Sequence, residues 1–292
     1  MKKIISCVTG TFRYGTSCSL VVTTLIKQSV FARNKNLKQI FVALLVVVSQ
    51  TACMNTTKHT RTSDENKTAV GETAIISDDF QSGVFSGKQW KSTRQNDFKT
   101  STIDIFDVGK SDLRLRMLAD TIGTRDDTVK FHGIRSVEPI SLTGRTVITY
   151  EMDWNNQSNG CYLTVGVYLC PTITDTNPRD EPNWMSFDYV GVPPGRNARF
   201  QIMEKINGNL RPLYTEGLPD KQKTGRKIGN QQIKVFVGDK FLKVMENGKE
   251  LFKSEDYVPR FTRAYLYLQM SSHNNYPARE IYFDNITVLE IK

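Results

Sequence analysis

The chain has 292 residues, of which 39% are hydrophobic and 24% charged, so its composition is that of a folded protein and excludes a long disordered chain. Its formal charge is +9, but residues 1–53 hold seven basic residues and no acid, which leaves only +2 for residues 54–292. Because the basicity belongs to the first segment, the charge gives no reason to expect a nucleic-acid partner.

Residues 1–53 have the pattern of an export signal. Basic residues precede the apolar run IFVALLVVVS, which is followed by QTAC and ends at Cys53. The run is too short to span a bilayer comfortably. A cysteine after a small residue resembles the lipobox of bacterial lipoproteins, in which that cysteine is acylated, although Gln50 replaces the usual aliphatic residue. We expect lipidation at Cys53 and a translation start near residue 30.

A flexible linker is expected over residues 54–74, which are polar and rich in Thr, Lys and Asn. Such a linker would hold a domain clear of a membrane. We therefore expect an exported protein that is lipid-anchored at the outer membrane or periplasmic face of a bacterium, with secretion as the alternative. The folded domain is expected over residues 75–292.

Cysteine usage fits an exported protein, because Cys161 and Cys170 are the only pair that follows Cys53. A disulfide between them would require a bend near Gly166 to bring the two Cα atoms within about 7 Å. Two small buried thiols are the alternative, and the sequence leaves both open. No Cys/His cluster has the spacing of a zinc site.

From residue 75 the chain reads as short alternating segments separated by turn residues, with no amphipathic helix. Two Asn-Gly pairs, at residues 207–208 and 247–248, predict tight hairpins. The expected strands cover 102–108, 113–118, 128–136, 146–154, 162–169, 185–192, 199–206, 210–216, 232–237, 241–246, 250–254, 265–271 and 281–291. This pattern predicts an all-β fold in which two antiparallel sheets pack as a sandwich.

Two polar segments predict long loops, at residues 171–183 (PTITDTNPRDEPN) and 217–229, and the second is basic. Loops of this length on a β scaffold are often part of a binding rim.

The stretch from residue 263 to 292 carries an unusual polar row. Alternation places Tyr265, Tyr267, Gln269, Ser271 and His273 on one side of a strand, with Leu266, Leu268 and Met270 on the other. A surface strand would normally carry Lys, Glu and Thr, so this row predicts a sugar-binding or catalytic floor. The alternative is a Tyr-rich strand that lines a core.

The segments DDFQSG, LKVMENGKELF and YLYLQMSSHNNYPAREIYFDNITV together resemble the concanavalin A-like lectin and glucanase superfamily, over about residues 75–292. The resemblance implies a jelly roll of two curved antiparallel sheets whose concave face forms a glycan groove. The superfamily contains lectins, glycoside hydrolases and polysaccharide lyases, and the fold alone does not select among them.

A retaining glycosidase of this superfamily would present a Glu-x-Asp-x-x-Glu run. The nearest match is Glu151-Met-Asp153-Trp-Asn-Asn156, which lacks the last acid. Glu151 and Asp153 are therefore expected to be ordinary polar positions, and a glycoside hydrolase is kept only as an alternative.

Elimination from a uronate polysaccharide needs a group that neutralises the carboxylate, a base for the C5 proton and an acid for the leaving oxygen. Tyr267 and Gln269 in YLYLQ are similar to the Tyr-x-Gln strand of jelly-roll alginate-type lyases. On another expected strand, Lys130 and His132 share one face while Arg135 points to the other.

From these residues we expect specific roles. His132 would be the base or carboxylate partner with Lys130 beside it, His273 the alternative base, Gln269 and Arg279 the carboxylate neutralisers, and Tyr267 or Tyr276 the proton donor. Tyr265, Tyr162 and Asn275 would contact substrate. A phenol needs a shifted pKa for this role, because it titrates near 10.

Three of these residues have alternative interpretations. His132 would be a buried hydrogen-bonded histidine, Lys130 a solvated residue and Arg279 the partner of Glu280.

The resemblance also implies a structural calcium, held by an acid near the first strand and one in the last strand. The matching residues are Asp78, Asp79 and Asp284 in DDF and YFDN. Alternatively, Asp78 and Asp79 cap a turn. No cofactor is expected to be required for the chemistry.

The sequence thus predicts a polysaccharide lyase that acts on an anionic, uronate-containing glycan, with ulvan as the narrowest expectation. The alternative from another class is a non-catalytic carbohydrate-binding module or lectin, in which Trp154, Trp184, Tyr162, Tyr265 and Tyr267 are stacking platforms.

Overall fold

The computed structural model describes residues 8–14, 18–24, 71–93, 100–120, 130–154, 163–175, 177–192, 197–217, 225–272 and 279–291. The chain divides into two units, Met1–Glu65 and Asn66–Lys292. In the first, β1 (Val8–Tyr14) and β2 (Cys18–Thr24) pair as a hairpin. No helix among the described residues is long and apolar enough to cross a membrane. Cys53 and the run before it lie outside these ranges, so export and lipidation stay predictions.

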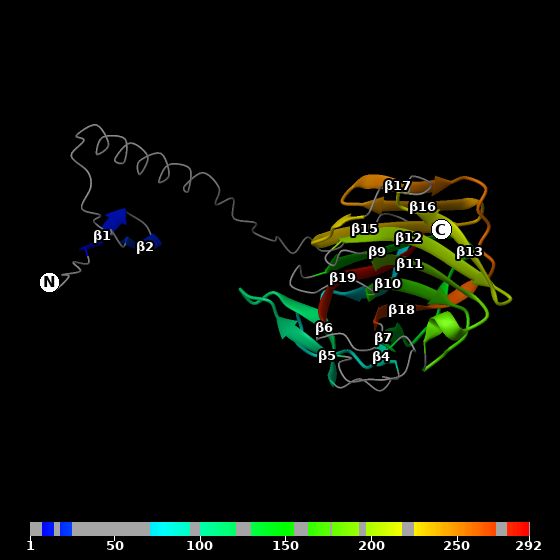
Figure 1. Cartoon of the computed structure of the whole chain (residues 1–292), viewed down its shortest axis with the longest axis horizontal. Coiled ribbons are helices and arrows are strands. Elements are labelled where there is room, and N and C mark those ends of the chain that lie inside the picture. The colour runs from blue at the N-terminus through cyan, green and yellow to red at the C-terminus, as the bar shows by residue number, and fades with distance from the viewer. Residues whose placement is uncertain are drawn as a thin grey trace. The chain divides into compact units, whose positions relative to one another are not determined.

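The second unit is a sandwich of two antiparallel sheets (Figure 1), as the sequence predicts. Sheet 1 has the order β13-β12-β11-β10-β18-β7-β4, with β14 on β12 and β8 on β18. Its strands are β4 (Trp90–Ser92), β7 (Lys130–Ser136), β8 (Ile140–Ser141), β10 (Leu163–Cys170), β11 (Trp184–Val192), β12 (Asn197–Ile206), β13 (Asn209–Thr215), β14 (Arg226–Lys227) and β18 (Arg263–Ser272).

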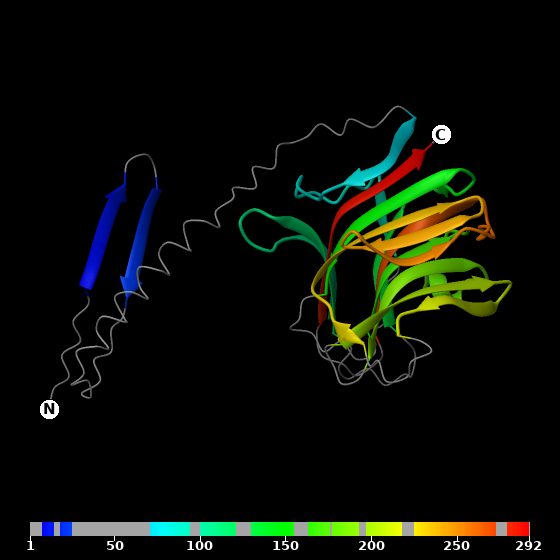
Figure 2. The same cartoon turned by 90° about the horizontal axis from the view of Figure 1, so that it is seen from above.

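Sheet 2 has the order β17-β16-β15-β9-β19-β6-β5, with β3 on β19. Its strands are β3 (Glu72–Asp78), β5 (Thr100–Asp107), β6 (Leu113–Asp120), β9 (Arg145–Asp153), β15 (Asn230–Gly238), β16 (Phe241–Glu246), β17 (Lys249–Ser254) and β19 (Arg279–Ile291). In Figure 2 the hairpin of β5 and β6 extends beyond the neighbouring strands.

The main core lies between the two sheets and follows from the alternation of the strands. Leu266, Leu268 and Met270 of β18 are buried in the same apolar cluster as Ile148 and Met152 of β9. Every second residue of a strand points to the same side, so the residues in between face away from the core. The expected alternation of β18 is confirmed.

The two predicted Asn-Gly hairpins are confirmed. Asn207 and Gly208 have φ of 50° and 81°, and Asn247 and Gly248 have φ of 49° and 77°. Positive φ at both central residues is the geometry that a two-residue hairpin of the type I′ class requires. These turns fix the register of β12 with β13 and of β16 with β17.

The strands β1 and β2 of the first unit were not predicted, and neither were four strands of the second unit: β3, β4, β8 and β14. Three of them have only two or three residues, which is too short for an alternation pattern to emerge. The first strand of the second unit, β3, begins at Glu72, just before the expected domain boundary at residue 75. Within β4, Trp90 is buried and its indole donates to Asp78 Oδ2 at 2.8 Å.

Cys170, at the end of β10, carries a free and buried thiol. Its Sγ lies 3.5 Å from Thr172 Oγ1 and 3.5 Å from the carbonyl oxygen of Asn183. Cys161 lies outside the described residues. A disulfide at Cys170 is therefore absent, in agreement with the buried-thiol alternative.

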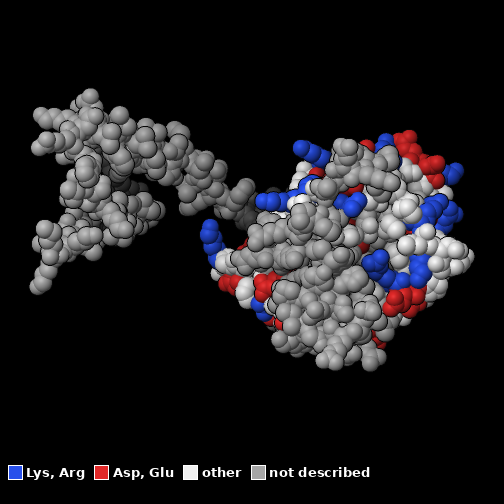
Figure 3. All heavy atoms as spheres, in the orientation of Figure 1, with Lys and Arg blue, Asp and Glu red and all other residues white. Residues whose placement is uncertain are grey.

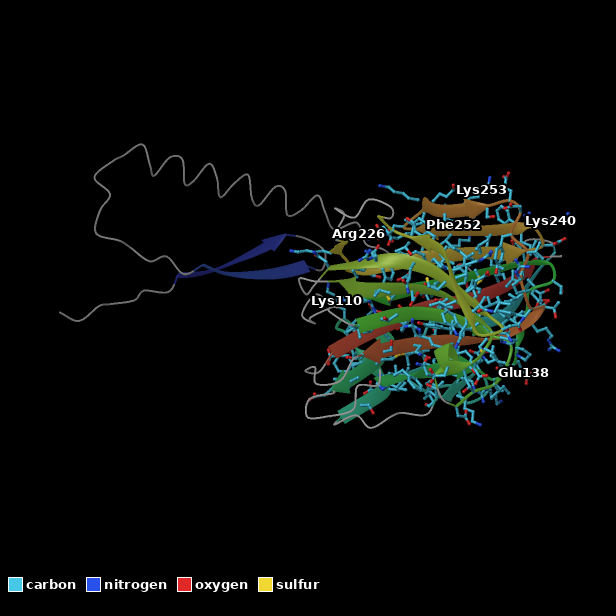
Figure 4. The ribbon with its side chains drawn as sticks, turned by 45° about the vertical axis from the view of Figure 1, so that its right-hand side comes forward. Lys110, Glu138, Arg226, Lys240, Phe252 and Lys253 are labelled. Carbon is cyan, nitrogen blue, oxygen red and sulfur yellow. The ribbon has the colours of Figure 1, made fainter. Side chains whose placement is uncertain are left out.

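An ionic clamp joins the two sheets at Arg226, which Figure 4 labels. Its Nε lies 2.7 Å from Glu216 Oε1, and its Nη2 binds Glu246 of sheet 2. Tyr189 of sheet 1 donates to the same Glu246 carboxylate. One cation thus bridges two carboxylates from different sheets, which holds β14 and the end of β13 close to β16.

Candidate functional site

The candidate site lies on the outer face of sheet 1, defined as the side that points away from sheet 2. Tyr265, Tyr267, Gln269 and Ser271 of β18 lie on this face, because the residues between them enter the main core. The face is not open, however, since Tyr267 is fully buried and Gln269 is 1% exposed. Another part of the chain must therefore cover it.

Strand register aligns a polar row across the outer face. Gly166 of β10 lies opposite Gln269 on one side and opposite Asp188 of β11 on the other. Asp188 in turn lies opposite Gln201 of β12. The row therefore runs Gln269, Gly166, Asp188, Gln201, with the glycine between the amide and the carboxylate.

An aromatic cluster lies beside this row on the same face. Tyr168, Trp184 and Tyr267 pack together with Cys170, apart from the main core, and Met203 and Tyr265 pack against them. The ring centroids of Tyr168 and Trp184 are 5.8 Å apart. Arg135 of β7 lies opposite Tyr267, and its guanidinium is 5.8 Å from the ring of Tyr265.

The predicted loop at residues 171–183 covers the aromatic cluster. We call its described residues, 171–175 and 177–183, the strap; it contains one turn of 3-10 helix, η1 (Pro178–Asp180). The Tyr267 hydroxyl accepts from the Thr174 amide at 2.9 Å, and Gln269 Nε2 donates to Asn177 Oδ1 at 2.9 Å. The Trp184 indole donates to the carbonyl oxygen of Arg179 at 3.0 Å. The loop thus covers the face as well as bordering it.

Asp188 is the most deeply buried acid of the site. Its carboxylate accepts from the Tyr168 hydroxyl at 3.0 Å, from Ser186 Oγ at 3.1 Å and from Gln201 Nε2 at 3.3 Å. Burial raises the pKa of Asp188, and the positive charge of Arg179 opposes that rise. The positive charge of Arg179, which belongs to the strap, thus favours the ionised form of this buried carboxylate.

The prediction that His132 shares a groove with Tyr267 and Gln269 is wrong. His132 lies opposite Met270, on the side of the sheet that faces the core, and it is fully buried. Burial lowers the pKa of His132 to about 3, so its imidazole is neutral at neutral pH. The register of β7 instead places Arg135 beside Tyr267. Lys130 lies opposite Ser272, and only its backbone is described.

The pKa of Tyr267 shifts away from the range that an activated phenol requires. Burial raises it to about 12, while Arg135 and the Thr174 amide act in the opposite direction. The hydroxyl also lies 3.3 Å from the carbonyl oxygens of Thr172 and Thr174. With its proton held this firmly, Tyr267 acts as a hydrogen-bond partner of the strap.

The other predicted contacts are distributed differently. Tyr162, His273, Asn275 and Tyr276 lie outside the described residues. The backbone of Arg279 begins β19 in sheet 2, opposite Ala119, and thus belongs to the other sheet. Trp154, an expected stacking platform, is fully buried in the main core, whereas Trp184 lies on the outer face.

The carboxylates considered for hydrolysis and for calcium lie elsewhere. Glu151 lies opposite Asp284 in sheet 2, and Asp153 lies 3.7 Å from Arg114. Asp79 Oδ1 accepts from the Gln81 amide at 3.1 Å, so it caps a turn. Among the described residues no three His, Cys, Asp or Glu side chains are placed to hold a metal ion. The structural calcium expected at Asp79 and Asp284 stays a prediction.

We predict that Asp284→Asn stabilises the chain at pH 7 by about 2 kcal/mol and not at pH 3.5. Burial raises the pKa of Asp284 to about 6, and Glu151 adds to the rise. Between pH 4 and pH 6 the unfolded chain loses this proton before the folded chain does, so wild-type stability falls as pH rises through that window. Urea unfolding at several pH values measures the effect. The exposed Glu138, labelled in Figure 4, provides the control Glu138→Gln; an equal gain from both variants would contradict the prediction.

Several residues of the site were missed from the sequence: Arg135 was assigned to the opposite face from the expected base, and Asn177, Arg179, Asp188 and Gln201 were given no role. A signal existed for Asp188, because it is the single acid in the otherwise mostly apolar strand WMSFDYVGV. A lone carboxylate within a buried strand needs partners. Those partners come from other strands and the strap, which the local pattern does not reveal.

Charges on the surface are mixed. On the side of the second unit drawn in Figure 3, blue and red side chains of the described residues are interspersed. This agrees with the small net charge that residues 54–292 carry.

The chain matches no protein-family model and no curated protein. Among solved structures it is similar to the T. cruzi calreticulin globular domain, with 14% identity and a TM-score of 0.50 over 75% of this chain and 89% of that chain. It is also similar to a GlcNAcα1-4Gal releasing endo-β-galactosidase from Clostridium perfringens, with 10% identity and a TM-score of 0.52 over 76% of this chain and 63% of that chain. At these identities the similarity shows the fold alone, which is a jelly-roll sandwich.

Proposed function

We propose that the chain binds a polysaccharide on the outer face of sheet 1. The observation that carries the proposal is the row Gln269, Gly166, Asp188, Gln201, which lies next to the cluster of Tyr168, Trp184 and Tyr267. Amide and carboxylate groups bind sugar hydroxyls, and aromatic rings with a polar edge stack on sugar rings. One of the structures with a similar fold is named as an endo-β-galactosidase, which supports a carbohydrate ligand.

The part of the face nearest β12 is the proposed entrance. Gln201, Arg199 and Thr164 are half-buried there, whereas the residues under the strap are buried. Arg199 and Arg135 place positive charge at the two sides of the row, so an anionic glycan is the proposed class of ligand. Export and an anchor at Cys53 would present this face to extracellular polysaccharide, and both belong to the proposal.

We predict that Gln201→Ala raises the dissociation constant for an oligosaccharide about tenfold. The substitution removes an amide that would contact the sugar and that also donates to Asp188. Calorimetric titration of the purified chain with alginate, ulvan and neutral β-glucan oligosaccharides measures the affinity. The matched control is Gln232→Ala, since Gln232 is an exposed glutamine of β15 in sheet 2. Equal affinities of the two variants would contradict the proposed site.

The second candidate function is β-elimination of a uronate glycan, for which ulvan is the narrowest candidate. Gln269, Tyr267 and Arg135 lie on the same face, and an arginine and an amide can neutralise a substrate carboxylate. The proposed base is His273 or Tyr276, because the register of β7 places both His132 and Lys130 opposite core-side positions of β18. Rising absorbance near 235 nm on incubation with ulvan or alginate reports the unsaturated product. Binding without that signal supports the non-catalytic function.

A further inference from the structure

The strap presents to the outer face the same kinds of groups that an acidic sugar would present. Asp175 Oδ1 lies 3.8 Å from Arg135 Nη2, and Asn177 Oδ1 accepts from Gln269 Nε2 at 2.9 Å. The strap thus offers a carboxylate to the guanidinium of Arg135 and a neutral oxygen acceptor to the amide of Gln269, on neighbouring strands. A uronate residue likewise carries a carboxylate together with hydroxyl and ring oxygens.

Among the residues that the structure describes, the strap leaves some buried polar atoms of this face without a hydrogen-bond partner. Within the described part of the chain, Gln269 Oε1 and Arg135 Nε are buried atoms without a hydrogen-bond partner. The two residues are 1% and 4% exposed, so bulk water does not reach these atoms freely. Burying an unpaired acceptor or donor costs free energy. A ligand that pairs with both atoms would therefore bind the face more completely than the strap does.

The strap makes several polar contacts with the face, in addition to the packing of its buried Pro178. Its amide at Thr174, its side chain at Asn177 and its carbonyl at Arg179 bind the face. Its exposed apolar residue, Ile173, is 52% exposed, and the Asp175 side chain is 63% exposed. Contacts of this kind can be exchanged for those of a polar ligand. Beneath them lie Tyr168, Trp184 and Tyr267, which are side chains suited to stacking on sugars.

We propose that the strap is an intramolecular competitor for the glycan, which covers the aromatic half of the face until an anionic sugar chain displaces it. This inference rests on the proposed function. The open half near Gln201 binds first, and full affinity requires release of Asp175 from Arg135 and of Asn177 from Gln269. A chain with a weakened strap therefore binds the same glycan more tightly than wild type does.

The test is the double variant Asp175→Ala/Asn177→Ala, compared with wild type in titrations with alginate oligosaccharides. We expect at least tenfold tighter binding and, without ligand, faster hydrogen exchange at the Thr174 amide, which donates to Tyr267. The control is Ile173→Ala, because Ile173 is in the strap and largely exposed; it should match wild type in both measurements. Gln269→Leu should free the strap and yet lose affinity.

The outcomes separate this inference from the proposed function. Tighter binding by the double variant supports the inference, including the case in which wild type shows no binding. If wild type binds and the double variant binds equally or less tightly, the strap is a fixed part of the fold and the inference fails, while the proposed function stands. If neither chain binds any of the glycans, both fail.

Discussion

Replacing Gly166 with alanine is expected to lower the free energy of unfolding by about 3 kcal/mol, near the upper end of what overpacking costs. A Cβ at this position would lie 2.3 Å from the carbonyl oxygen of Phe187 and 2.5 Å from the Cα of Asp188. Both are backbone atoms of β11, so no side-chain movement relieves the contact. The β10 and β11 strands would have to separate at the centre of the polar row.

Urea unfolding of Gly166→Ala and of Gly87→Ala checks this expectation. No atom lies within 4 Å of a Cβ built at Gly87, so alanine there should change stability by no more than about 0.5 kcal/mol. If Gly166→Ala is as stable as Gly87→Ala, the close approach of β10 and β11 is not as described.

Replacing Asp188 with alanine should destabilise the chain by about 3 kcal/mol, because it leaves several buried donors without an acceptor. The hydroxyls of Tyr168 and Ser186 and the amide of Gln201 all donate to the Asp188 carboxylate, which is fully buried. Burial raises the pKa of Asp188 while the charge of Arg179 opposes that rise, so we expect the two charges to stabilise each other.

A double-mutant cycle isolates that interaction. Arg179→Met removes the cation, and the double variant Asp188→Ala/Arg179→Met should lose at least 1 kcal/mol less than the sum of the single losses. Asp239→Ala, at an exposed position of the turn between β15 and β16, is the control for loss of an acid. Additive losses would show that Arg179 of the strap and Asp188 of the polar row do not interact, which would contradict the prediction.

Much of the fold could be predicted from local sequence. The alternation of Tyr265 to Ser271 and the hairpins at Asn207 and Asn247 depend on the period of a strand and on the positive φ of a tight turn. Both are properties of neighbouring residues. For that reason the two faces of β18 and the sandwich class were predicted correctly.

The partners across strands could not be predicted in the same way. A shift of one residue in register moves a side chain to the opposite face, and nothing near His132 specifies that it lies opposite Met270. The pairing of Gly166 with both Gln269 and Asp188 likewise depends on which strands are neighbours. The predicted set therefore contained the right face of β18 with the wrong residues of β7.

The role of the strap was also beyond local sequence. Its polar, Pro-containing composition predicts a loop, and that prediction is confirmed. That the loop folds back over Tyr267 follows from contacts made by Thr174 and Asn177, more than 90 positions away from their partners. Loop composition alone carries no information about such contacts.

The central claim, that the outer face of sheet 1 binds a glycan, is tested most directly by the side-chain amide resonances of glutamine during a titration. With alginate oligosaccharides added to the labelled chain, the account predicts that the amide signals of Gln201 and Gln269 shift while that of Gln232, on sheet 2, stays in place. Shifts at Gln232 without shifts at Gln201 and Gln269 would contradict the claim.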